Sequence, residues 1–171
     1  WGRPRKVSSA IGIVKTNGTL WTWGRNFSGV LGQNNETNYS SPKQVPGTTW
    51  VCFRSVPENA MATKTDGTLW VWGANPSGQL GQSSPSNSDV SSPVQIPGTD
   101  WDTVNFDLTR TTCFATKTDG TLWVWGSNDP GQLGQNQPNP SNVSSPIQIP
   151  GTTWTGAKSI GWNGAILYKG V

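Results

Sequence analysis

The stretch Lys64–Gln82 reads KTDGTLWVWGANPSGQLGQ, and Lys117–Gln135 reads KTDGTLWVWGSNDPGQLGQ. The two agree at 16 of their 19 positions, and Lys15–Gln33, KTNGTLWTWGRNFSGVLGQ, is a third copy. Each copy continues into Ser-Ser-Pro, then into Pro-Gly, and then into a tryptophan. Self-similarity at a fixed period is typical of repeat architectures, in which each unit buries its apolar faces only against its neighbours.

The tryptophan that follows each Pro-Gly marks the start of a new unit. The boundaries that we expect are residues 1–49, 50–100 and 101–153 for three repeats and 154–171 for a partial fourth, all in one propeller domain or arc. The third unit has two more residues than the second between this tryptophan and the lysine of the motif. An even insertion leaves the alternation of a strand in phase, so we expect no change of face beyond it.

Each unit is predicted to form a short antiparallel sheet. An Asn-Gly or Asp-Gly pair stands between two apolar runs, which predicts a tight hairpin whose two turn residues both adopt positive φ. After the turn, Thr-Leu-Trp-x-Trp-Gly alternates with period two, so Trp21 and Trp23 share one face. We expect a further strand after the Ser-Ser-Pro proline (Val94–Ile96) and another after the tryptophan (Trp50–Val56). The fold class is therefore all-β, with four-stranded propeller blades, about three of them plus a partial fourth.

The pattern DGTLWxWGxNxxGQLG followed by SSPxQIPG resembles the repeats of the regulator of chromosome condensation family, and the resemblance covers essentially the whole chain. It implies a seven-bladed propeller with one repeat per blade. The near-identity of the copies resembles bacterial and phage arrays of such repeats. Three blades in an open arc leave two apolar faces uncovered. We therefore expect a larger closed ring, completed by the same chain extended or by neighbouring subunits.

Composition argues against enzyme chemistry. The chain has no histidine, which is the usual general base and the commonest metal ligand, and only 12% of its residues are charged. Cys52 and Cys113 lack the spacing of a zinc site and are predicted to be unrelated buried thiols. Glu58, Asp100 and Asp102 form no constellation that sequence spacing alone would bring together. We expect no catalytic residue, no metal and no cofactor.

The net charge of +3 is accounted for by three basic residues near the start of the chain. A nucleic-acid groove needs a clustered basic stripe, so we do not expect nucleic-acid binding. No stretch approaches the roughly 20 apolar residues of a membrane-spanning helix, and we expect no membrane partner.

The paired tryptophans allow two interpretations. They could form a stacking platform for sugars or bases, or they could fill the gap between blades. Identical positions in every unit favour packing between blades. The pairs are Trp21 and Trp23, Trp70 and Trp72, and Trp123 and Trp125.

The segments that differ between units follow the conserved Leu-Gly-Gln and are expected to lie on one rim of the propeller. A conserved frame with one varied rim is typical of a binding scaffold. The candidate binding residues are Asn34, Glu36, Tyr39, Ser86, Asp89, Gln137 and Asn139. Glu36 and Tyr39 make the first of these loops the most ligand-like.

The prediction that follows is a non-catalytic scaffold for protein–protein interaction or a structural role, as a component of a virion or of an extracellular surface. Two alternatives stay open. The resemblance implies a guanine-nucleotide exchange factor or chromatin-binding module, although the exchange-specific loop insertion is absent from these units. Aromatic side chains on the rim would suit a carbohydrate-binding module with a glycan partner.

Overall fold

The computed structural model describes residues 10–83, 88–129, 131–136, 141–159 and 165–169. Within these ranges the chain forms β-strands and one short 3-10 helix, η1 (Phe27–Gly29). The strands are β1 (Ala10–Val14), β2 (Leu20–Gly24), β3 (Tyr39–Gln44), β4 (Trp50–Ser55), β5 (Asn59–Lys64), β6 (Leu69–Gly73), β7 (Val90–Ile96), β8 (Trp101–Leu108), β9 (Thr112–Lys117), β10 (Leu122–Gly126), β11 (Val143–Ile149), β12 (Trp154–Ser159) and β13 (Ala165–Lys169).

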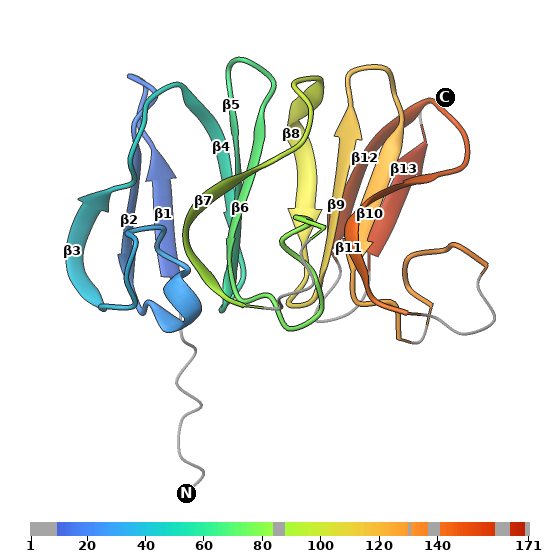
Figure 1. Cartoon of the computed structure of the whole chain (residues 1–171). Helices are drawn as coiled ribbons and strands as arrows, with labels where there is room; N and C mark the ends of the chain where they lie inside the picture. Colours follow the sequence, from blue (N-terminus) through green and yellow to red (C-terminus); the bar gives the residue numbers. More distant parts are fainter. Residues whose placement is uncertain (1–9, 84–87, 130, 137–140, 160–164, 170–171) are drawn as a thin grey trace, which may run out of the picture.

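The strands form four separate antiparallel sheets that follow one another along the chain (Figure 1). Strands β1–β3 make the first sheet, β4–β7 the second, β8–β11 the third, and β12 and β13 pair as the beginning of a fourth. Every neighbour in a sheet is also a neighbour in sequence. The expected four-stranded antiparallel unit is therefore confirmed in the second and third sheets.

The central hairpins differ from the predicted turn type. In the β5–β6 turn, the N–H of Gly67 donates to the carbonyl of Lys64 at 3.1 Å, and the N–H of Lys64 donates to the carbonyl of Thr68 at 3.1 Å. Gly67 has a φ of 76°, whereas Asp66 is not among the residues with positive φ. This is a type I turn followed by a left-handed glycine, so the expectation of two positive φ angles was wrong. A side chain at position 67 would collide with the carbonyl oxygen of Thr99, which adds a packing reason for glycine.

The aspartate of this turn has a structural partner instead. One carboxylate oxygen of Asp66 accepts hydrogen bonds from the hydroxyl and the backbone N–H of Thr68, at 2.6 and 3.1 Å. The hydroxyl of Thr68 in turn accepts one from the indole N–H of Trp70 at 2.8 Å. The same chain of bonds recurs from Asp119 in the third sheet and from Asn17 in the first. It explains why the turn residue, Thr and Trp recur together in the motif.

The outer strand of each sheet begins earlier than predicted. Strand β7 starts at Val90, before Pro93, and not at Val94. Val71 pairs with Val94, but Gly73 pairs with Val90, so the outer strand has two extra residues at this point. Proline has no N–H to donate, and a bulge on an outer strand tolerates it inside the strand. Proline therefore does not mark the strand entry.

The two extra residues of the third unit form a bulge at the start of β8. Phe53 pairs with Ala62 in the second sheet, and Phe106 pairs with Ala115 in the third. The irregularity lies between Trp101 and Phe106, and the pairing beyond it is equivalent to that of the second sheet. The prediction that an even insertion keeps the strand in phase is confirmed.

The core lies between the sheets, in apolar layers that join one sheet to the next. One layer contains Trp50 and Trp72 from the second sheet against Leu20 of the first, and the next contains Trp101 and Trp125 against Leu69. Trp72 and Trp125 have no exposed surface. In the second and third sheets, the face that carries the tryptophans thus packs on the opposite face of the preceding sheet.

The first sheet carries the same face without a preceding sheet among the described residues. Ile11 pairs with Trp23 and Ile13 with Trp21, and the two isoleucines are 47% and 55% exposed. In the second sheet the equivalent residues are alanines that are fully buried or nearly so. The first sheet thus has an open face where the equivalent face of the second sheet is covered.

Candidate functional site

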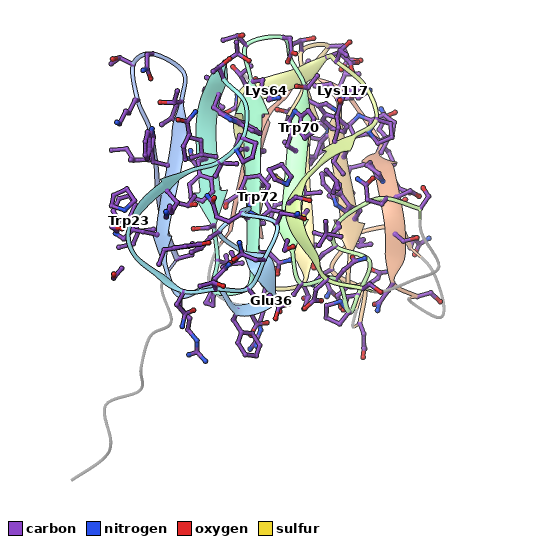
Figure 2. All side chains as sticks on the ribbon, turned by 60° about the vertical axis from the view of Figure 1, so that its left-hand side comes forward. Trp23, Glu36, Lys64, Trp70, Trp72 and Lys117 are labelled. Carbon is purple, nitrogen blue, oxygen red and sulfur yellow. The ribbon has the colours of Figure 1, made fainter. Side chains whose placement is uncertain are left out.

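The loops divide between two ends of the sheets. The β1–β2, β5–β6 and β9–β10 hairpins lie at one end, here called the hairpin rim, and the β2–β3, β6–β7 and β10–β11 loops lie at the opposite end, here called the loop rim (Figure 1). Figure 2 shows Lys64 and Lys117 at the hairpin rim and Glu36 at the loop rim. The segments that vary between units therefore occupy the loop rim of the described structure.

A buried asparagine supports each loop of the loop rim. The side-chain oxygen of Asn26 accepts from the N–H of Leu31 at 2.8 Å, and its amide donates to the carbonyl of Asn35 at 2.7 Å. Asn75 and Asn128 accept in the same way from the residue five positions later, both at 3.0 Å. The varied segments are thus attached to a conserved frame.

A second side chain closes each loop from its far end. Asn38 accepts from the backbone N–H of Asn26 at 2.8 Å, and Asp89 accepts from that of Asn75 at 3.1 Å. Asn142 does the same in the third sheet at 3.3 Å. The carboxylate of Asp89, one of the predicted binding residues, is therefore engaged in holding its own loop.

Asn34, another predicted binding residue, contributes through its backbone. It has a φ of 57°, and its N–H donates to the carbonyl of Ser91 in the next sheet at 2.8 Å. Ser83 has a φ of 53° and bonds in the same way to Ser144. The position thus joins adjacent sheets, and Asn is a residue type that tolerates the left-handed conformation.

Tyr39 borders a hollow of about 580 Å³ on the first sheet. The hydroxyl of Tyr39 accepts from the amide of Asn35 at 3.2 Å, and the Nζ of Lys43 lies 5.5 Å from the centre of its ring. Glu36 is exposed on the same loop. The hollow is lined by Gly24, Arg25, Asn38, Tyr39 and Ser40.

The sequence analysis did not single out Phe27, an exposed aromatic residue. Phe27 follows Arg25, which lines this hollow, by two positions in the sequence. Phe27 is 56% exposed, and the guanidinium carbon of Arg25 lies 5.3 Å from the centre of its ring. Both residues fall inside the conserved motif, where the other units have small, polar or proline residues. The equivalent trios are Arg25, Phe27 and Tyr39 in the first unit, Ala74, Pro76 and Val90 in the second, and Ser127, Asp129 and Val143 in the third. This difference inside the motif is the signal that could have identified them.

The other predicted residues are the rest of the loop candidates and the tryptophan pairs. Ser86, Gln137 and Asn139 lie outside the described residues. In the second and third units, the second tryptophan of each pair (Trp72 and Trp125) is buried between sheets. The first tryptophan of each pair (Trp70 and Trp123) is half-buried. Trp21 and Trp23 are both half-buried on the open face of the first sheet.

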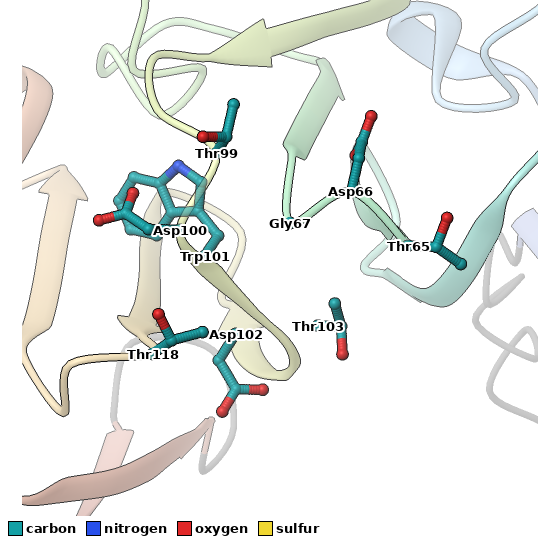
Figure 3. Close-up of a pocket in the computed structure, with 9 residues that line it drawn as sticks. All are labelled: Thr65, Asp66, Gly67, Thr99, Asp100, Trp101, Asp102, Thr103 and Thr118. Carbon is teal, nitrogen blue, oxygen red and sulfur yellow. The ribbon is translucent and has the colours of Figure 1, made fainter.

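The hairpin rim carries a second, acidic hollow of about 530 Å³ between the second and third sheets (Figure 3). Asp66, Asp100 and Asp102 line it together, although the sequence analysis found no carboxylates that belong together. Each has a partner: Asp66 accepts from Thr68, Asp100 pairs with the Nζ of Lys117 at 3.1 Å, and Asp102 accepts from the N–H of Val104 at 2.9 Å. In the part of the chain that the structure describes, no three His, Cys, Asp or Glu side chains are grouped so that they could hold a metal ion.

The hydrogen bonds from the hydroxyl and N–H of Thr68 lower the pKa of Asp66, with a smaller contribution from Lys64. Burial raises the pKa of the Cys113 thiol well above its ordinary value, and the charge of Asp107 adds to this rise. Cys113 therefore stays a neutral thiol at physiological pH. Cys52 is only half-buried, so the expectation of two buried thiols was right for Cys113 alone.

Comparison with known proteins identifies the repeats. The model of the regulator of chromosome condensation (RCC1) repeat matches residues 17–56, 66–103 and 119–160. No curated protein sequence matches the chain significantly. Across the described residues there is no helix that has the length and apolar character needed to span a membrane.

Solved propeller structures have the same fold. Human WBSCR16 superposes with a TM-score of 0.70 at 22% identity, over 81% of this chain and 35% of that one. Prp20p from Saccharomyces cerevisiae, whose report describes its binding properties to Gsp1p and histones, gives 0.73 at 14% identity, over 94% of this chain and 42% of that one. Yeast RCC1 (Prp20) bound to Kap60 gives 0.67 at 18% identity, with coverage of 82% and 35%. The chain thus spans less than half the length of each of these structures.

Proposed function

The chain belongs to the regulator of chromosome condensation (RCC1) repeat family, and from that premise we propose that it is a non-catalytic propeller scaffold that binds another protein. The binding surface that we propose is formed by Arg25, Phe27 and Tyr39 on the loop rim, and is called here the aromatic rim surface. The observation that carries the proposal is the replacement of this trio by Ala, Pro and Val in the second unit and by Ser, Asp and Val in the third, within the same frame.

The residue types of this surface support protein recognition. Arginine, tyrosine and phenylalanine are enriched at protein–protein interfaces because they combine large contact areas with few rotatable bonds or with several donors. Here Arg25 lies over Phe27, and Asn35 and Lys43 hold Tyr39. Such preorganisation lowers the entropy lost on binding. The adjacent hollow offers a concave seat for a partner side chain.

The absence of catalysis is part of the proposal. The chain contains no histidine, and Cys113, the buried thiol, has a raised pKa that keeps it un-ionised. The three carboxylates of the acidic hollow are each engaged by a hydrogen bond or an ion pair. A general base or nucleophile needs a free group of suitable pKa, which these residues do not offer.

We also propose that the sheets belong to a closed ring, with repeat boundaries at residues 1–49, 50–100, 101–153 and 154–171. The open face of the first sheet supports this proposal, because Ile11 and Ile13 stay about half exposed where the equivalent residues of the next sheet are buried. Either the same chain extended or a neighbouring subunit would cover it. Light scattering of the full-length protein distinguishes the two by mass.

Site-specific photocrosslinking tests the aromatic rim surface. We would place p-benzoylphenylalanine at position 27 in the full-length protein and, as a matched control, at position 76, which is the equivalent and also exposed position in the second unit. Discrete protein adducts are expected at position 27 and not at position 76.

The triple variant Arg25→Ala, Phe27→Pro and Tyr39→Val installs the residues of the second unit at these three positions. It should preserve the melting temperature to within a few degrees and abolish binding to the crosslinked protein. Identical adducts at both positions, or unchanged affinity of the triple variant, would contradict the proposal.

The alternatives have separate tests. Accelerated release of labelled nucleotide from a small GTPase would favour an exchange factor, and binding to histones would favour a chromatin module. Glycan-array binding that is lost in Tyr39→Ala, with the fold preserved, would favour a carbohydrate-binding module, since Tyr39 and Phe27 are accessible aromatic side chains. A virion or extracellular surface location stays a prediction from the sequence.

A further inference from the structure

Lys43 is a further basic residue that distinguishes the first unit. It lies on β3, and the residues at the same register of β7 and β11 are Val94 and Ile147. Those two side chains are half-buried and pack against apolar clusters of the core, whereas Lys43 is exposed. The first unit therefore carries a charge where the other two units have an apolar contact.

With Lys43, four positions of the first unit differ from the shared frame in the same direction. The first unit has two basic and two aromatic residues at these positions, the second unit has four uncharged residues, and the third has one acidic and three uncharged residues. The sets are Arg25, Phe27, Tyr39 and Lys43 in the first unit, Ala74, Pro76, Val90 and Val94 in the second, and Ser127, Asp129, Val143 and Ile147 in the third. The combination of cations with aromatic rings is thus specific to the first unit.

Tyr39 links the two basic side chains to one hollow. Arg25 and Tyr39 both line the hollow of about 580 Å³, and the Nζ of Lys43 lies 5.5 Å from the centre of the Tyr39 ring. The guanidinium carbon of Arg25 lies 5.3 Å from the centre of the Phe27 ring. Each aromatic ring therefore has a cation over it, and this contact favours one orientation of a long, flexible side chain.

Neither cation is neutralised by a carboxylate of the described chain. Across the described residues, no carboxylate oxygen lies within 4.0 Å of Arg25 or of Lys43, and Glu36, on the same loop, is exposed and forms no ion pair. Arg110 provides the contrast, because its guanidinium binds both carboxylate oxygens of Glu58. The planar donors of Arg25 are thus available to a carboxylate from another molecule.

Acidic protein segments and single-stranded nucleic acids are two classes of ligand that bind cations beside aromatic rings. Nucleic acid needs a groove in which several cations follow its backbone. Here Glu36 interrupts the positive charge on the loop itself, and the third unit has Asp129 at the position of Phe27. The positive charge therefore does not continue along the loop rim, which favours a short acidic protein segment.

We propose that the aromatic rim surface, extended by Lys43, binds an acidic segment of the partner protein. Arg25 binds one carboxylate of this segment through two N–H donors, and Lys43 supplies the charge for a second. Phe27 and Tyr39 add apolar contact area beside the ion pairs. The inference rests on the proposed function, because it names the chemistry of the partner at the same surface.

Arginine NMR on the full-length protein tests the proposal. With ¹⁵N-labelled arginine, the Nε–H signal of Arg25 is assigned through Arg25→Gln. The probe is a synthetic peptide of alternating glycine and glutamate, and the comparison ligands are the matched peptide of glycine and glutamine and an oligothymidylate. We expect a saturable shift of the Arg25 signal with the glutamate peptide at millimolar concentration, which added sodium chloride weakens. The glutamine peptide should give a several-fold smaller shift.

Two lysine variants separate this surface from general attraction of charge. Lys43→Met should weaken the binding of the glutamate peptide several-fold, whereas Lys15→Met should leave it unchanged. Lys15 is the matched control because it lies at the hairpin rim with its Nζ 4.2 Å from the centre of the Trp21 ring. No saturable shift, an equal response to the glutamine peptide, or an equal loss in both lysine variants would overturn the proposal. Tighter binding of the oligothymidylate would also overturn it, in favour of a nucleic-acid surface.

Failure of this inference is distinct from failure of the proposed function. A protein that crosslinks at position 27 but binds the Arg25→Gln and Lys43→Met variants as tightly as the wild type would overturn the acidic segment alone. The scaffold and its aromatic rim surface would then stand. No adduct at position 27 would instead contradict the surface as a whole.

Discussion

The indole Nε1 of Trp72 donates a hydrogen bond of 2.7 Å to the backbone carbonyl of Val30, and this bond joins the second sheet to a loop of the first. Trp125 repeats it across the next interface, with 2.9 Å to the carbonyl of Gln79. Val30 and Gln79 occupy the same position of the Gly-x-Leu-Gly turn in successive units. The second tryptophan of the motif therefore has two roles, as a buried apolar surface and as a donor to the preceding sheet.

The first prediction concerns this bond. Trp72→Phe removes the N–H, leaves the carbonyl of Val30 without its donor, and opens a cavity in a fully buried layer. We expect the free energy of unfolding to fall by about 2–4 kcal/mol, measured by urea denaturation with far-ultraviolet circular dichroism. Trp23→Phe is the matched control at the half-buried equivalent position, and its loss should be clearly smaller. Equal losses would contradict the role assigned to the bond.

Much of this fold is predictable because its determinants are local and repeated. The Asp-Gly turn, the alternation of Trp-x-Trp and the repeated Pro-Gly place the hairpins and strands without knowledge of the neighbouring sheets. The turn type was wrong because Asp66 is held in its conformation by Thr68 and Trp70, through bonds that turn statistics do not contain. The predicted start of β7 was wrong because the bulge in this strand depends on its pairing with Gly73.

The candidate site was only partly predictable. Tyr39 and Glu36 lie in a segment of varied length, which attracts attention in an alignment of the units. Arg25 and Phe27 were missed because they lie inside the conserved motif, where only a position-by-position comparison of the units finds them. The acidic hollow was missed because Asp66 and Asp102 come from different units, and only the packing of the second sheet against the third brings them together.

The second prediction uses a glycine that occurs at one position in all three units. Gly29 has a φ of 75°, and a Cβ there would lie 2.3 Å from the Cβ and 2.4 Å from the Cα of Ser91 in the next sheet. Gly131 has a φ of 101°, and a Cβ there would meet no atom of the described residues within 4 Å. Both alanine variants lose about 1–2 kcal/mol to the left-handed backbone, but only Gly29→Ala also separates two sheets. Thermal unfolding should show a clearly larger fall in melting temperature for Gly29→Ala than for Gly131→Ala. Equal falls in the two variants would contradict the close approach of the sheets.

The third prediction concerns thiol reactivity. Cys113 is buried, its sulfur donates to the carbonyl of Gln79 in the preceding sheet at 3.3 Å, and burial raises its pKa. In a Cys52→Ser background, the Cys113 thiol should not react with a disulfide reagent at pH 8 until the protein is unfolded in urea. Rapid labelling of the folded protein would contradict the tight packing of the second and third sheets.

The fourth prediction is a dependence of stability on pH. Hydrogen bonds from Thr68 and Thr121, with smaller contributions from Lys64 and Lys117, lower the pKa of Asp66 and Asp119 in the folded protein. A carboxyl group whose pKa is lower in the folded state than in the unfolded state binds protons preferentially when unfolded. Its stabilising contribution is present above the unfolded pKa of about 3.9 and is lost as the pH falls through the folded pKa.

Asparagine provides the matched variant for this test, because Asn17 already accepts the same two bonds from Thr19 in the first sheet. The double variant Asp66→Asn and Asp119→Asn keeps the acceptor oxygen but cannot titrate. Its urea-unfolding stability should fall less steeply than that of the wild type between pH 5 and pH 2.5, while the two proteins differ little in fold at pH 7. Parallel pH profiles would show that these two carboxylates do not contribute to acid unfolding, and that the threonine bonds favour the charged and neutral forms alike.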